Sequence, residues 1–158
     1  MIAISSEDIV QGAILLIDKP YGWTSFDVVR KVKYALSKHS GIKKVKVGHA
    51  GTLDPLATGL LIVCVGRFTK KIEEIQAMPK AYSGTFYIGA TTPSYDLETE
   101  VDAHYATTHI TPELIEQARQ RFVGDIMQVA PIHSAKKING QRAYDHARKG
   151  EEVEMKQS

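Results

Sequence analysis

Apolar residues fall into short unbroken runs and into helix-spaced series along the chain, which predicts strands that alternate with helices. The run over residues 13–17 stops at Lys19-Pro20-Tyr21-Gly22, as expected of a buried strand that ends in a turn. A second run, over residues 60–65, lies between two glycines, and residues 80–88 are also β-prone, with Tyr82 on one face. We expect the last two segments to be neighbouring strands of one sheet.

Helix signals separate these predicted strands. Thr24 and Asp27 have the spacing of a capping box, and the helix that follows them is expected to end at Ser40-Gly41. Its expected apolar face consists of Phe26, Val29, Val32 and Leu36. Residues 111–113 combine a cap, a proline at the first helical position and an acid, so they predict a second helix that ends before Gly124.

Beyond this second helix the local signals are short. Asn139-Gly140 predicts a tight hairpin turn, residues 143–149 a short helix closed by Gly150, and residues 151–155 the beginning of a strand. There is no internal repeat and no low-complexity linker. The pattern as a whole predicts an α+β or mixed fold with one hydrophobic core.

The composition is that of an ordinary globular protein. The 158 residues are 43% hydrophobic and 24% charged, which excludes the disordered and collagen-like classes. The single cysteine, Cys64, lies inside an apolar run, so we expect a buried thiol and a reducing, cytoplasmic compartment. No secretory signal pattern opens the chain and no apolar stretch is long enough to span a membrane, so we expect no membrane partner.

Basic residues gather in one window although the net charge is only +2. No acid occurs between Asp27 and Asp54. The window contains Arg30, Lys31, Lys33, Lys38, His39, Lys43, Lys44, Lys46 and His49. Two interpretations are open: a surface that binds a phosphate backbone, or a solvated helix face and loop.

The segment of residues 48–59 is the strongest candidate for chemistry. It contains three glycines and runs directly into the predicted strand at residue 60, and loops held by a rigid scaffold commonly carry function. Pro55 restricts Asp54 to extended conformations, so the carboxylate points in a defined direction. The two interpretations of Asp54 are a catalytic carboxylate and an Asx-type turn.

Residues 48–59 closely resemble the Gly-His-x-Gly-x-Leu-Asp-Pro-x-Ala-x-Gly signature of TruB-type pseudouridine synthases, the bacterial tRNA pseudouridine-55 synthases. Residues 18–25, Asp-Lys-Pro-Tyr-Gly-Trp-Thr-Ser, are similar to the Asp-Lys-Pro-x-Gly-x-Thr-Ser opening of that family. Later segments resemble the family in order, namely 68–70, 80–82, 131–135, Gly140 and 143–144. The resemblance covers residues from Gly12 to the end and implies a mixed, largely antiparallel sheet flanked by helices.

The resemblance implies isomerisation of uridine to pseudouridine in the T-loop of tRNA, without cofactor or metal. Asp54 would be the catalytic residue, acting at C1′ or C6 of the nucleotide or through a glycal-type route. Tyr82 would stack on the extracted base, and His49 would hold the space that the base leaves. Gly51, Thr52, Lys19 and Lys70 are the other substrate-binding candidates.

Each candidate has a simpler alternative. His49 could satisfy backbone groups of its own loop, and Tyr82 could be a core residue. Lys19 could position the loop rather than bind phosphate, and Lys70 could be uninvolved. Asp96 aligns with a family aspartate, but its surroundings depart from the usual Thr-Asp-Thr-x-Asp pattern.

The resemblance is incomplete at the C-terminal side. The family's Lys-Gly-x-Tyr-Ile-Arg segment, whose arginine pairs with the catalytic aspartate, does not occur in the 158 residues. We therefore expect an N-terminal extension over 1–11 and a partial catalytic domain over 12–158, without the PUA-type RNA-binding domain. Such a piece is expected to be a monomer and, alone, weakly active or inactive. The other functions considered are a tRNA-binding module without catalysis and a guide-RNA-dependent relative.

Overall fold

The structure is a computed structural model that describes residues 5–127, 137–138 and 141–142. The chain divides into two compact units, Met1–Ser83 and Gly84–Ser158. The first contains the larger sheet and both sequence motifs, residues 18–25 and 48–59. Among the described residues, none of the helices reaches the length and apolarity that crossing a membrane requires.

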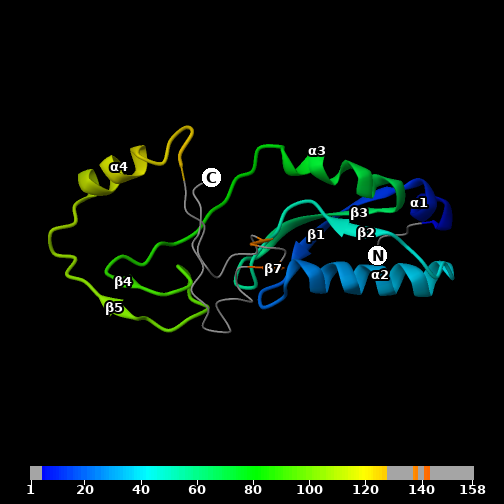
Figure 1. The fold of residues 1–158 in the computed structure, drawn as a ribbon, viewed down its shortest axis with the longest axis horizontal. Helices are drawn as coiled ribbons and strands as arrows, with labels where there is room; N and C mark the ends of the chain where they lie inside the picture. The colour runs from blue at the N-terminus through cyan, green and yellow to red at the C-terminus, as the bar shows by residue number, and fades with distance from the viewer. Residues whose placement is uncertain (1–4, 128–136, 139–140, 143–158) are drawn as a thin grey trace. The chain divides into compact units, whose positions relative to one another are not determined.

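The first unit is organised around a three-stranded antiparallel sheet with the strand order β1-β3-β2 (Figure 1). In this sheet β1 (Ala13–Lys19) pairs with the full length of β3 (Gly59–Val65), and β2 (Val47–His49) pairs with the end of β3. Both strands predicted at residues 13–17 and 60–65 are therefore present. The burial expected of β1 is wrong, because its alternate residues Ile14 and Leu16 are 43% and 63% exposed. The register pairs Lys19 with Gly59, so the turn that follows β1 and the loop that precedes β3 emerge at the same end of the sheet.

One face of the sheet is covered by α2 (Ser25–Ser40), which has the predicted capping box from Thr24 and Asp27. The Thr24 hydroxyl and backbone N–H donate hydrogen bonds to the Asp27 carboxylate, and these bonds hold the pKa of that carboxyl below its usual value. Gly41 ends the helix in the left-handed conformation that glycine adopts without strain. Val28 packs against Leu61 and Val63 of β3.

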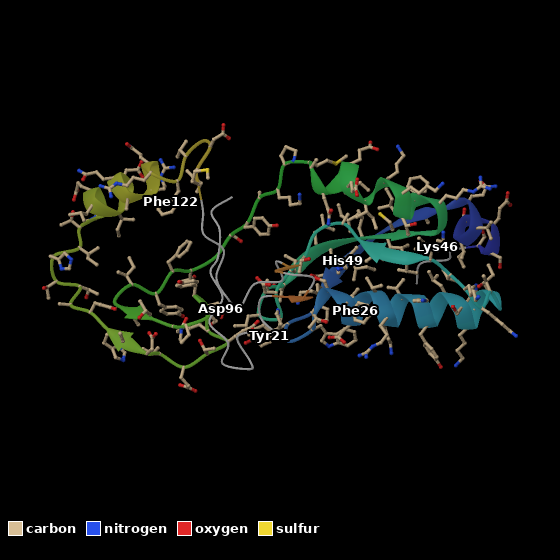
Figure 2. All side chains as sticks on the ribbon, in the orientation of Figure 1. Tyr21, Phe26, Lys46, His49, Asp96 and Phe122 are labelled. Carbon is tan, nitrogen blue, oxygen red and sulfur yellow. The ribbon has the colours of Figure 1, made fainter. Side chains whose placement is uncertain are left out.

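The predicted apolar face of this helix is wrong at one position. Phe26 is 66% exposed, whereas its neighbour Val28 is buried together with Val29 and Leu36. The helical period allows either residue to face the core, and the register of α2 on the sheet selects Val28. Phe26 lies in the first turn of the helix and points to solvent, as Figure 2 shows.

Shorter helices cover the other face and one end of the sheet. The 3-10 helix η1 (Gly66–Lys71) leads into α3 (Ile72–Gln76), whose Ile75 packs against Ala50 and Cys64. Cys64 is fully buried, as predicted, and burial raises the pKa of its thiol. In the N-terminal stretch that was expected to be an extension, α1 (Ser6–Gln11) buries Ile9 against Leu36, Val45 and Val65.

The second unit has little burial in its described part. A two-stranded ladder joins β4 (Ala90–Thr91) to β5 (Ala103–His104), and α4 (Pro112–Gln120) follows with the predicted cap at Thr111. A second ladder joins β6 (Lys137–Ile138) to β7 (Gln141–Arg142), as the predicted hairpin requires. Over residues 84–127 no side chain is buried. The α+β class with antiparallel sheets is confirmed.

The strand predicted over residues 80–88 does not form. These residues have no ladder partner in the described part of the chain, and Phe86 is 92% exposed. A strand requires a neighbour for its backbone groups, so β propensity alone does not produce one. The turn at 139–140, the helix at 143–149, the strand at 151–155 and the motif residues 131–135 lie outside the described residues.

We predict a large difference in hydrogen exchange between these two units of the 158-residue chain. Amides of β3 should exchange slowest, because Leu61, Val63 and Val65 are buried under helices. Amides over residues 84–127 should exchange fast, since no buried side chain holds their backbone. Exchange followed by mass spectrometry measures both in one sample, and equal protection of the two regions would contradict this account.

Candidate active site

The loop between β2 and β3, residues 50–58, is held by the turn between β1 and α2. The Gly22 N–H donates to the Pro55 carbonyl oxygen at 2.8 Å, and the Lys19 ammonium lies 3.4 Å from the same oxygen. Pro55 directly follows Asp54, so this turn anchors the C-terminal side of the aspartate. The two motifs found in the sequence are therefore in direct contact.

Ser25 anchors the other side of Asp54. Its hydroxyl donates to the Leu53 carbonyl oxygen at 3.0 Å and accepts from the Leu53 N–H at 2.9 Å. Only 4% of Ser25 is exposed, so water competes little for these two bonds. The residues before and after Asp54 are thus both bonded to one segment of the chain, 19–25, which restricts the backbone that carries the carboxylate.

Lys19 is fully buried at the end of β1. Its ammonium donates to the carbonyl oxygens of Pro20 at 3.0 Å, Trp23 at 2.5 Å and Pro55 at 3.4 Å. An ammonium has three donors, and these carbonyls occupy all of them. This geometry supports loop positioning, one of the two roles considered for Lys19, over direct binding of phosphate.

Asp54 itself is exposed. The Ala57 N–H donates to its main-chain oxygen at 3.0 Å, so the turn after Asp54 is closed by the backbone. Within the described residues the carboxylate has no hydrogen-bond or ion-pair partner. An Asx-type turn would instead require the carboxylate to accept a backbone N–H, so the side chain is left available for an external group.

His49 closes the opposite end of the loop. Its Nδ1 lies 2.6 Å from the Gly51 carbonyl oxygen, and because that oxygen can only accept, Nδ1 carries the proton. Nε2 is then the nitrogen left for another partner. Gly51 has a φ of 110°, in the region that favours glycine, and this conformation accompanies the bond to His49. The simpler interpretation of His49, that it satisfies a backbone group of its own loop, therefore holds for Nδ1 but leaves Nε2 unaccounted for.

The segment that leads to Tyr82 begins beside this loop. A Cβ atom placed on Gly51 would lie 3.7 Å from the Lys80 Cε, so the Lys80 stem passes over the loop. The Lys80 ammonium donates to the carbonyl oxygens of Gln76 and Met78. Tyr82, two residues further on, is 74% exposed and has no described contact with Asp54.

The remaining candidates are not gathered at the loop. Thr52 is an exposed loop residue, and Lys70 is exposed on η1 without a described partner. In the second unit, Asp96 accepts hydrogen bonds from the Ser94 hydroxyl at 2.5 Å and the Glu98 N–H at 2.9 Å, which stabilise a local turn. No cluster of three metal-binding side chains occurs in the described parts of the chain.

Sequence reasoning missed the roles of Gly22 and Ser25. Both residues lie inside the motif of residues 18–25, but nothing local indicates that they bind a loop about thirty residues away. The motif itself was the available signal. Thr24 already caps the helix, so the neighbouring hydroxyl of Ser25 was free to bind another part of the chain.

Comparison with known proteins places the chain in a family. The family model for the N-terminal domain of TruB family pseudouridylate synthases matches residues 38–158, which include the Asp54 loop. The chain belongs to the TruB family. A relative named tRNA pseudouridine synthase B from Phocaeicola vulgatus is 59% identical over 146 residues, covering 92% of the chain and 62% of the relative.

Other relatives with the same name give the same result. The protein from Flavobacterium johnsoniae is 56% identical over 96% of the chain and 67% of its own length, and that from Chloroherpeton thalassium is 47% identical over 93% and 60%. The chain spans about three fifths of the length of the curated relatives it matches first. The TruB family resemblance stated from the two motifs is confirmed.

Proposed function

We propose that this chain is part of an enzyme that converts uridine to pseudouridine in the T-loop of tRNA, with Asp54 as the catalytic residue. The observation that carries the proposal is an exposed carboxylate without a described partner, between two backbone positions that are both anchored. Membership of the TruB family supplies the reaction class. The relatives' printed name supplies tRNA as the substrate class.

The reaction exchanges one glycosidic bond for another and needs no external oxidant or reductant. The N1–C1′ bond of uridine breaks, the base turns, and a C5–C1′ bond forms. The proton on C5 leaves and N1 gains a proton, so atoms and electrons balance. A carboxylate suits these steps because it can form a covalent adduct or stabilise positive charge at the sugar.

A base inside a folded RNA loop must first leave its stack, at a cost of a few kcal/mol. Tyr82 is the proposed stacking partner, and one aromatic contact with a base contributes about 1–3 kcal/mol. The exposure of Tyr82 and the position of Lys80 against Gly51 support this role. His49 Nε2 and Thr52 are the proposed polar contacts of the displaced nucleotide, and Lys70 a proposed phosphate contact.

Lys19 and Gly51 enter the proposal as positioning residues. Lys19 links the turn after β1 to Pro55, and Gly51 accepts the bond from His49. Both act on the backbone around Asp54 rather than on the nucleotide. The proposed enzyme acts as a cytoplasmic monomer without a cofactor.

The test is tritium release from an RNA hairpin with the sequence of a tRNA T-arm, labelled at C5 of its uridines. The assay uses the protein at full family length, because the chain spans about three fifths of its relatives. We expect release of the label from one T-loop uridine, since the C5 proton is lost only when the new carbon bond forms. Release from no T-loop uridine would refute the proposal.

A further inference from the structure

A hollow of about 550 Å³ opens between α2, β2 and η1. Four lysines contribute to its lining, Lys33, Lys43, Lys44 and Lys46. No carboxylate lines it, and residues 28–53 contain no acid. All four lysines are exposed, and none has an ion pair within the described residues. We call the concave surface that these four lysines line the lysine hollow.

The lysine hollow has a rigid base. Val45 lies between Lys44 and Lys46 and is buried against Ile9, Leu36 and Val65, which fixes the turn that carries its neighbours. The Lys46 carbonyl oxygen accepts the Gly66 N–H at 2.9 Å, which ties this position to the end of β3. The ammonium groups are therefore presented from an ordered backbone.

We propose that the lysine hollow binds the sugar-phosphate backbone of the RNA substrate, away from the nucleotide on which Asp54 acts. Several unpaired cations around a concave surface without acids attract a polyanion, and lysine acts on phosphate as a point charge. That this polyanion is tRNA rests on the proposed function.

The position of the lysine hollow fits a second contact on the same RNA. Lys46 directly precedes β2, and His49 ends it, so an extended backbone at about 3.3 Å per residue separates them by about 10 Å. Figure 2 shows Lys46 toward the far end of α2, and His49 nearer its beginning. A phosphodiester strand that reaches the loop can continue along β2 to the lysine hollow.

The test compares two double variants of the full-length protein with equal loss of charge. Lys43→Gln with Lys46→Gln removes two lysines of the hollow, whereas Lys31→Gln with Lys38→Gln removes two from the same acid-free window outside it. The dissociation constant for an unmodified tRNA transcript is measured between about 50 and 200 mM salt. Each phosphate contact contributes about 0.7–0.9 to the slope of log affinity against log salt.

For the hollow variant we expect the slope to fall by about 1.5 and the affinity at about 0.1 M salt to fall about tenfold. The control variant should change neither. Tritium release by the unsubstituted protein is measured in parallel, and its absence would be recognised separately as failure of the proposed function. Equal slopes for the two variants would overturn the proposal. Binding of both variants to phosphatidylserine vesicles is also measured, and loss of vesicle binding in the hollow variant with RNA binding intact would overturn it as well.

Discussion

Asp54→Asn should abolish tritium release from the T-arm hairpin while RNA affinity stays within about twofold of the unsubstituted protein. The amide keeps the size and shape of the side chain but provides neither a nucleophile nor a negative charge, and loss of an essential catalytic group lowers the rate by at least about a thousandfold. Folding should not change, because the carboxylate is exposed and has no described partner whose bond would be lost.

Asp125→Asn is the matched control for this substitution. Asp125 is also exposed but lies in the second unit, outside both motifs, so its loss should leave the rate unchanged. The same pair of variants distinguishes the enzyme from a tRNA-binding module without catalysis. If Asp54→Asn released tritium at the unsubstituted rate, the carboxylate would have no catalytic role and the binding module would be favoured.

Ser25→Ala should lower kcat about ten- to a hundredfold and leave KM for RNA nearly unchanged. The substitution removes both bonds to Leu53 and leaves its N–H and carbonyl oxygen without their partner. A shift of about 1 Å in a catalytic group costs about a hundredfold in rate, and each unsatisfied buried group costs about 1–3 kcal/mol of stability. The variant should therefore be both slower and less stable.

Ser40→Ala separates these two effects. The Ser40 hydroxyl also makes two backbone bonds, to the Leu36 oxygen at 2.8 Å and from the Ile42 N–H at 3.2 Å, at the other end of α2. It should lower the melting temperature without lowering kcat. Steady-state kinetics and thermal unfolding of both variants provide the comparison. An equal fall of kcat in the two would mean that Ser25 acts only through general stability.

Local signals predicted the elements whose backbone is satisfied within a few residues. The capping box of Thr24 and Asp27, the proline start of α4 and the glycine end of α2 each depend on neighbours three or four residues away. The apolar runs also sufficed to predict β1 and β3 as strands, but they did not predict that Ile14 and Leu16 of β1 are exposed. The segment over 80–88 failed for the opposite reason, since a strand exists only beside a partner.

The sequence by itself determined the family, the main elements of the first unit and the candidate carboxylate, because two motifs of eight and twelve residues are specific patterns in order along the chain. Only the tertiary structure decided how Asp54 is held. Ser25 meets Leu53 across 28 residues and Lys19 meets Pro55 across 36, because the antiparallel register of β1 on β3 brings both segments to one end of the sheet. Contacts set by register leave no periodic trace in the sequence, so the anchoring of the loop could be found only in three dimensions.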